Sequence, residues 1–213
     1  MKVVLVDYES GNLHSAAKAF QRMSAETGAK TGAEIIVCAD ADQVARADRI
    51  VLPGDGAFPA CREALAAVPG MIDALNHAVL NRGVPFMGIC VGMQMLATTG
   101  HEYRLTPGLD WIGGEVVAID AAGLKVPHMG WNDLRVRSDH PVLAGVSSGD
   151  HAYFVHGWHM QLADPSHLLA DVDYGGPVTA IVGRDNIIGT QFHPEKSQGL
   201  GLRIIGNFLN WKP

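Results

Sequence analysis

The sequence predicts an α/β fold with a doubly wound, mostly parallel central sheet, helices on both faces and added antiparallel strands in the C-terminal half. In the first half, short apolar runs alternate with segments of helical periodicity, as in parallel strands joined by right-handed crossover helices. In the second half, short strand-like runs follow one another with Gly or Pro between several of them, as in antiparallel hairpins. The composition, 47% hydrophobic and 18% charged, is that of a globular chain.

Each element follows from its own pattern. Buried strands are predicted at residues 2–6, 34–37, 49–52 and 85–89, because these runs are mostly apolar. Helices are predicted by apolar residues at helical spacing, which are Leu13, Ala16, Ala17, Phe20 and Met23, then Leu65, then Ile72, Leu75 and Val79 after a break at Pro69-Gly70. Shorter strands are predicted at 115–119, 133–136, 152–155, 178–182 and 187–191, with a tight turn at 184–186. The last helix buries Ile204, Ile205, Phe208 and Leu209.

Length and charge limit the classes of function. The 213 residues fit one domain, residues 1–213, and no repeat or linker divides them. The formal net charge is −6 and the 16 lysines and arginines form no cluster, so we expect neither nucleic acid nor a membrane surface as a partner. Residues 3–6 are too short an apolar run for a signal peptide, and three widely spaced cysteines make no disulfide framework. We therefore expect a cytoplasmic protein with reduced thiols.

The main chemical signal is Cys90, at a predicted strand-to-helix junction. It lies in residues 88–92 (GICVG), a Gly-x-nucleophile-x-Gly pattern at the end of a buried strand. Such a turn is strained and crowded, so its flanking positions favour glycine. The helix N-terminus favours a thiolate by only ~0.3–1 kcal/mol, so a nearby imidazole is also required. Cys38 and Cys61 lack this setting and are interpreted as ordinary buried residues.

The predicted base is His193, with Glu195 as the carboxylate that orients it. Both belong to residues 189–195, which end the last predicted strand. On an extended chain, a spacing of two lets the carboxylate reach the imidazole and fix its tautomer, which leaves the other ring nitrogen to face the thiol.

His156 and His159, three residues apart after a strand, are the competing candidates for chemistry. A zinc site would need further ligands, and His128 is the only obvious recruit. We therefore expect no metal and no cofactor.

Taken together, these segments resemble the class I (triad-type) glutamine amidotransferases. That resemblance is carried by residues 52–56 (LPGDG), 88–94 (GICVGMQ) and 191–195 (QFHPE). A narrower resemblance, to the glutaminase subunits of imidazole glycerol phosphate synthase, is carried by residues 7–13 (DYESGNL), 125–132 (KVPHMGWN), 153–156 (YFVH) and 193–198 (HPEKSQ). The resemblance covers the chain from end to end.

The resemblance implies an activity and a set of site residues. Glutamine would be hydrolysed to glutamate and ammonia through a Cys thioester, and the ammonia would pass to a cyclase subunit that makes imidazole glycerol phosphate and AICAR in histidine biosynthesis. By position, the catalytic triad would be Cys90, His193 and Glu195. The oxyanion hole would use backbone N–H groups of Val91 and of the Gly54-Asp55 turn. Glutamine would be bound by Gln94, Glu102, His156, Gly157 and Trp158, and the partner by Asn12, Trp131 and Lys196.

The implied partner is a cyclase subunit of (β/α)8-barrel fold, docked near the active site as a heterodimer so that ammonia travels through an enclosed path. Two positions depart from the family pattern. Many relatives have Ser-Tyr where this chain has Gly157-Trp158, so contacts there would come from the backbone. Asp55 replaces a small apolar residue, and we expect its side chain to face outward, away from the oxyanion.

Other interpretations stay open at this stage. The Cys90 turn alone also fits a γ-glutamyl hydrolase, a cysteine peptidase or the glutaminase subunit of another class I amidotransferase. A non-catalytic scaffold for a barrel partner belongs to a different class of function. Residues 128–131 argue against the hydrolase and the peptidase, and the intact Cys, His and Glu argue against the scaffold.

Overall fold

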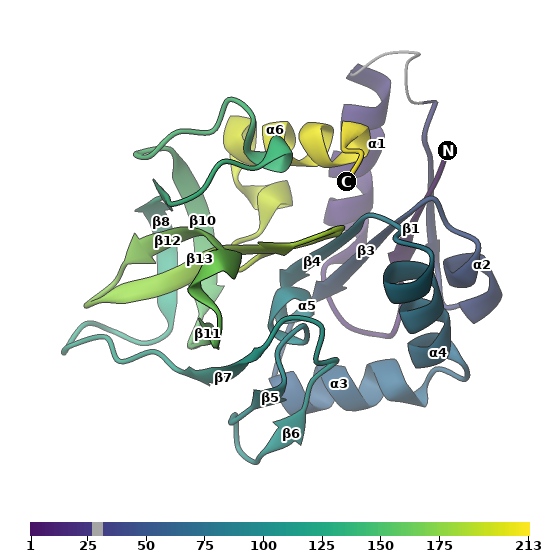
Figure 1. The fold of residues 1–213 in the computed structure, drawn as a ribbon. Coiled ribbons are helices and arrows are strands. Elements are labelled where there is room, and N and C mark those ends of the chain that lie inside the picture. Colours follow the sequence, from purple (N-terminus) through teal and green to yellow (C-terminus); the bar gives the residue numbers. More distant parts are fainter. Residues whose placement is uncertain (27–31) are drawn as a thin grey trace.

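Eight strands form the central sheet of the computed structural model, which describes residues 1–26 and 32–213. Their order is β2-β1-β3-β4-β14-β13-β12-β9, so both halves of the chain contribute to one sheet (Figure 1). The parallel strands are β2 (Glu34–Cys38), β1 (Lys2–Val6), β3 (Arg49–Gly54), β4 (Phe86–Cys90) and β14 (Ile187–Thr190). The sheet continues antiparallel through β13 (Pro177–Arg184), β12 (Leu168–Asp173) and β9 (Arg135–Val136).

Helices cover both faces of the parallel strands. On one side, α1 (Leu13–Glu26) packs against α6 (Gln198–Asn210), with the rings of Phe20 and Phe208 edge to face at 6.2 Å. The other side carries α2 (Ala41–Ala45), α3 (Phe58–Ala67), α4 (Met71–Asn76) and a π-helical turn (His77–Asn81) (Figure 1). Right-handed crossovers require this division, because the chain reverses its direction across the sheet after β2.

Two smaller sheets complete the second half of the chain. β10 (His151–His156) pairs antiparallel with β8 (His128–Asp133). β11 (Trp158–Leu162) pairs antiparallel with β7 (Gly114–Ala118), which also borders the short strands β5 (Thr99–Gly100) and β6 (Thr106–Pro107). Since only Gly157 separates β10 from β11, the two small sheets meet at residues 156–158. Short 3-10 turns occur at Pro141–Leu143, Pro165–His167 and Pro194–Lys196.

The predicted fold class is confirmed, and so are the four N-terminal strands and the C-terminal helix. The single strand predicted at 133–136 is wrong. β8 ends at Asp133 and β9 begins at Arg135 in a different sheet, because the intervening Leu134 is fully buried and its N–H bonds the carbonyl of Asp150. The last predicted hairpin exists, but β14 also pairs in parallel with β4 and so belongs to the central sheet.

Several elements were not predicted, among them α2, β11 and β12. In β12 the apolar pattern is interrupted by Asp171, which is buried although charged. Its two carboxylate oxygens accept hydrogen bonds from Arg135 at 2.8 Å and from Arg137 at 3.0 Å. The two arginines that compensate the buried charge lie outside β12, so the local pattern of β12 gives no sign of them. Within the described residues, no helix is both long and apolar enough to cross a membrane.

Candidate active site

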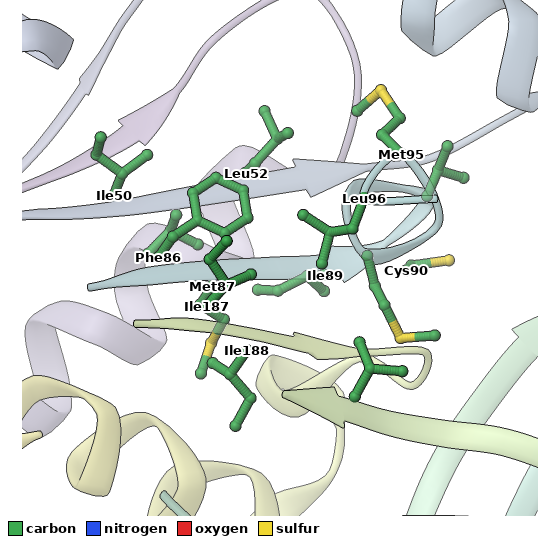
Figure 2. Close-up of a cluster of buried hydrophobic side chains, with 14 of the residues drawn as sticks. Ile50, Leu52, Phe86, Met87, Ile89, Cys90, Met95, Leu96, Ile187 and Ile188 are labelled. Atoms are coloured by element: carbon green, nitrogen blue, oxygen red, sulfur yellow. The ribbon is translucent and has the colours of Figure 1, made fainter. Parts of the chain in front are cut away.

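Cys90 ends β4 and precedes the short helix α5 (Val91–Gln94) in a conformation that non-glycine residues rarely adopt, with φ 55° and ψ −111°. β3 and β14 hold β4 on both sides, so the sheet enforces this strained turn. Cys90 is 4% exposed and lies at the carboxyl end of its strand, next to the packed apolar side chains that Figure 2 shows on β3, β4 and β14. This is the strained strand-to-helix turn that the Gly-x-Cys-x-Gly pattern predicts.

The glycines of this turn are required by close backbone approaches. A Cβ on Gly92 would lie 1.8 Å from the carbonyl oxygen of Leu52, and one on Gly88 would lie 2.5 Å from the carbonyl oxygen of Gly92. On the neighbouring strand, a Cβ on Gly54 would lie 2.8 Å from the nitrogen of Gly92. The predicted collision of side chains at the flanking positions is therefore confirmed, and only glycines let the turn pack on β3.

His193 and Glu195 form a buried pair beside the thiol. Nδ1 of His193 lies 2.9 Å from Oε1 of Glu195, and the two side chains are 4% and 3% exposed. Burial lowers the pKa of the ring, but its side-chain interaction with Cys90 and its hydrogen bond to Glu195 outweigh burial and raise the pKa of His193 to about 10. Nε2 of His193 is buried, and no acceptor within the described residues lies in full hydrogen-bond geometry with it. The imidazolium therefore has one N–H free for the sulfur or a substrate.

The segment that carries His193 is anchored to β10. The N–H of His193 donates to the carbonyl of Tyr153 at 3.2 Å, and the hydroxyl of Ser197 donates to the carbonyl of His193 at 2.7 Å. The same hydroxyl accepts the N–H of Tyr153 at 3.0 Å. The antiparallel half of the chain thus positions the His193 imidazole, whereas the parallel half positions the Cys90 thiol.

A cavity of about 200 Å³ opens beside the thiol. It is lined by Asp55, Gly56, Cys90, Val91, Gln94, Glu102, Pro127, Val155, His156, Gly157 and Trp158. All five residues expected to bind glutamine border it. Gly54 is not among the lining residues but pairs with Cys90 in the β3–β4 ladder.

Two polar side chains of the cavity already have partners. Oε2 of Glu102 accepts the N–H of Phe58, the first residue of α3, at 2.7 Å. Nε2 of Gln94 donates to the carbonyl of Trp158 at 3.0 Å and to Oε1 of Gln191 at 3.1 Å. Both N–H bonds of Gln94 are therefore used, and its own Oε1 is the atom left to contact a ligand.

The turn expected to supply an oxyanion donor is bound to Ser10. The N–H of Asp55 donates to Oγ of Ser10 at 3.2 Å, and Oγ of Ser10 contacts the carbonyl oxygen of Asp55 at 2.8 Å. In this arrangement the N–H of Asp55 is occupied. By contrast, Val91 is the first residue of α5, and its N–H has no partner inside the helix. Asp55 itself is exposed.

His128 and His156 form a second buried pair at the edge of the cavity. Nδ1 of His128 lies 3.0 Å from Nε2 of His156, and Nδ1 of His156 lies 2.9 Å from the carbonyl oxygen of Trp158. Burial lowers the pKa of His128 to about 4 and that of His156 to about 3, so both rings are neutral at pH 7. Across residues 1–26 and 32–213, no three or more His, Cys, Asp or Glu side chains are grouped to hold a metal ion.

The residues assigned to a partner interface lie at or near the surface. Asn12 is exposed and Lys196 is partly buried. Trp131 is 48% exposed and packs edge-on against Tyr153, with ring centroids 5.8 Å apart. An exposed apolar strip runs along the chain to Trp131 and comprises Leu124, Val126, Met129 and Trp131.

Two site residues were missed by the sequence reasoning, Ser10 and Gln191. Nε2 of Gln191 lies 3.7 Å from Sγ of Cys90. Its signal was its position two residues before His193, because side chains two apart on an extended chain share a face. Ser10 had no comparable signal, since it reaches Asp55 from 45 residues away.

Comparisons with known proteins show which family this chain is similar to. The family model of class-I glutamine amidotransferases matches residues 4–211. Over the full length of both chains, this chain is 62% identical to the imidazole glycerol phosphate synthase subunit HisH of Ruegeria pomeroyi and 56% identical to that of Rhodospirillum rubrum.

Solved structures support the fold. A crystal structure of a glutamine amidotransferase superposes with a TM-score of 0.72 at 18% identity, covering 98% of this chain and 99% of that one. The glutaminase domain of Trypanosoma brucei CTPS with bound acivicin superposes with a TM-score of 0.67 at 15% identity, covering 99% and 91%. At such identities the likeness concerns the fold alone.

Proposed function

Because the chain belongs to the class-I glutamine amidotransferases, among the HisH subunits of imidazole glycerol phosphate synthase, we propose that Cys90, His193 and Glu195 form its catalytic triad. Its function is to hydrolyse glutamine as the glutaminase subunit of that synthase in histidine biosynthesis. The observation that supports the triad is the strained Cys90 turn beside an imidazole whose Nδ1 is bound by a buried carboxylate. The hydrolase and peptidase interpretations do not fit this family.

In the first half of the reaction, the Cys90 thiolate attacks the side-chain amide carbon of glutamine, and the C=O electron pair moves onto oxygen. The N–H of Val91 can donate to this oxyanion. As the C–N bond breaks, Nε2–H of His193 gives its proton to the leaving nitrogen. Ammonia departs, and a γ-glutamyl thioester remains on the sulfur.

In the second half, neutral His193 removes a proton from water while the water oxygen attacks the thioester carbon. The C–S bond then breaks, the electron pair returns to sulfur, and glutamate is released. His193 is again an imidazolium beside a thiolate. Throughout the cycle, Glu195 keeps the ring oriented and stabilises its positive charge.

The Gly54-Asp55 turn supplies the second oxyanion donor once the N–H of Asp55 is released from Ser10. This assignment is supported by the position of Asp55 on the cavity wall. One such donor contributes ~2.7–4 kcal/mol to the transition state, so the conformation of this turn controls the rate. Gln94, Glu102 and the segment from His156 to Trp158 hold the amino-acid end of glutamine, because they border the cavity at the thiol.

The chain acts in a complex with a partner subunit, as the name of its relatives states. The proposed partner is a cyclase of (β/α)8-barrel fold in a heterodimer, and it docks on the face that carries Asn12, Trp131 and Lys196. The exposed apolar strip that ends at Trp131 supports this face, because exposed apolar patches mark interaction sites.

One domain, residues 1–213, carries the function in the cytoplasm. The continuous hydrophobic core and the shared eight-stranded sheet support one domain. The cytoplasm is supported by three free cysteines, Cys38, Cys61 and Cys90.

A Cys90→Ala variant tests the proposed function. Glutamine-dependent synthesis by the complex should be lost, while synthesis from added ammonium should persist. Cys38→Ala is the matched control and should keep both activities. A glutamine-analogue electrophile should label Cys90 alone. Loss of both activities in Cys90→Ala would mean that Cys90 is structural.

A further inference from the structure

Gln191 is fully buried between Cys90 and a residue of the glutamine cavity. Nε2 of Gln191 lies 3.7 Å from Sγ of Cys90, and Oε1 of Gln191 lies 3.1 Å from Nε2 of Gln94. Both ends of the amide are therefore engaged. The sulfur has the imidazole of His193 as one neighbour and an amide as another.

The direction of these bonds is fixed by one backbone carbonyl. The oxygen of Trp158 can only accept, so the atom of Gln94 that faces it at 3.0 Å must be Nε2. The same Nε2 also faces Gln191, so the atom of Gln191 on that side must be the acceptor Oε1. Nε2 of Gln191 is then left to face Cys90. The amide of Gln191 therefore presents an N–H donor to the sulfur, and a flipped amide would bring two donors together.

Resting on the proposed role of Cys90 as nucleophile, we propose that Gln191 is a further catalytic residue, which donates a hydrogen bond to the Cys90 thiolate. A hydrogen bond from a buried amide favours the charged form of an acceptor over its protonated form. The donor stabilises the thiolate before attack. It stabilises the thiolate again in the second half of the reaction, when the C–S bond breaks and the electron pair returns to sulfur.

Gln94 positions this donor. Its two N–H bonds link the carbonyl of Trp158 to Oε1 of Gln191, and its own Oε1 is free for a ligand in the cavity. A glutamine bound at Gln94 and the sulfur that attacks it are thus joined by two amides. The nucleophile is oriented by the same side chain that contacts the substrate.

The test compares two variants of Gln191 with the wild-type chain in the complex with its partner subunit. Gln191→Met keeps the volume but removes both polar atoms. Gln191→Glu keeps the size and the acceptor for Gln94 but removes the donor toward sulfur. Gln161→Met, at an exposed glutamine of β11, is the matched control. The readouts are the pH dependence of Cys90 alkylation by iodoacetamide, followed by mass spectrometry, and kcat and KM for glutamine.

In Gln191→Met, the pH midpoint of Cys90 alkylation should rise by about one unit, and the rate of alkylation below that midpoint should fall. In Gln191→Glu the midpoint should rise further, because an acceptor oxygen then faces the sulfur. In Gln191→Glu kcat should fall at least tenfold, while KM stays within about twofold because Gln94 keeps its partner. If Gln191→Met does not fold, Gln191→Glu decides alone.

A wild-type alkylation midpoint in Gln191→Glu would overturn the role of Gln191, because the residue would then only support Gln94. A wild-type chain that no glutamine-analogue electrophile labels at Cys90 would instead overturn the proposed nucleophile. The two failures are therefore distinguishable.

Discussion

Two buried histidine sites near the same cavity differ in charge: His156 lines the cavity, and His193 interacts with Cys90, which also lines it. His193 is 3% exposed, and His128 and His156 are 2% and 6% exposed, so burial alone does not separate them. The carboxylate of Glu195 and the sulfur of Cys90 raise the pKa of His193 to about 10 against the effect of burial. The other pair makes hydrogen bonds only to neutral groups and has no carboxylate partner. Burial lowers the two pKa values to about 4 and about 3, and repulsion from neighbouring histidines, His193 among them, adds to the effect at His156. The partners of a buried ring, not its depth, therefore decide its charge.

The neutral pair has a different use from the charged one. The carbonyl of Trp158 accepts, so Nδ1 of His156 carries the proton and Nε2 of His156 must accept from Nδ1 of His128. Nε2 of His128 then accepts from the amide of Asn132 at 3.2 Å. This directed chain supports the cavity wall at residues 156–158 without placing a positive charge there.

The largest expected difference in activity comes from a His→Gln substitution at the charged site. His193→Gln should lower kcat for glutamine hydrolysis by about a thousandfold or more, because the proton donor and acceptor of both reaction halves is lost. Ammonium-dependent synthesis by the complex should stay near the wild-type rate. Steady-state kinetics with glutamine and with ammonium as nitrogen source checks this. A decrease in kcat for glutamine hydrolysis of less than tenfold would contradict the role of His193.

Removing the charge next to that ring should have the next largest effect. Glu195→Gln should lower kcat about 10- to 100-fold and bring the pKa of His193 down from about 10, since a cause that raises it is lost. NMR titration of the His193 ring measures this directly. A raised folded-state pKa stabilises the protein below pH 6.5, and this contribution is lost as pH rises toward 10. In Glu195→Gln this stabilising contribution should be lost at a lower pH than in the wild type. An unchanged titration of the His193 ring would contradict its pairing with Glu195.

At the neutral site, a His→Gln substitution should act on the binding of glutamine. His156→Gln keeps a donor for the carbonyl of Trp158 but loses the ring that meets His128. We expect KM for glutamine to rise about tenfold with kcat within about threefold, because the cavity wall shifts while the triad stays intact. The kinetic constants of His156→Gln and His193→Gln, measured together, test the comparison. A loss of kcat as large as that of His193→Gln would show that the two sites do not differ in role.

The smallest effect concerns acid stability. A lowered folded-state pKa stabilises the protein above pH 6.5, and this contribution is lost as pH falls through about 4 for His128 and about 3 for His156. His128→Phe keeps a ring between Phe154 and Tyr174 but removes one titrating group. Its Tm at pH 7 should be lower than that of the wild type, because hydrogen bonding that contributes about 1 kcal/mol to the free energy of unfolding is lost. Between pH 6.5 and 4, however, its Tm should decline less. The control is His14→Gln, at an exposed histidine. If Tm declined in parallel with falling pH in His128→Phe and in the wild type, the prediction would be contradicted.

Local patterns were sufficient for the parallel strands and for the Cys90 turn. A buried strand needs a continuous apolar run, and a crowded turn needs glycine where backbones meet, so both requirements appear within a few neighbouring residues. The pair of His193 and Glu195 was predictable for the same reason, because its two members lie two residues apart. Asp171 shows the opposite case, since the arginines that let a charge be buried lie in other segments.

By itself, the sequence determined the fold class, the strained turn at Cys90 and the pairing of His193 with Glu195, because each depends on neighbours along the chain. Only the tertiary structure decided which groups meet around the sulfur. The amide of Gln191 beside Cys90, the hydrogen bonds between Ser10 and Asp55, and the charge on one histidine site but not the other all arise from contacts between segments far apart in the sequence. The direction of a hydrogen bond and the charge of a buried ring depend on those partners, and no local pattern encodes them.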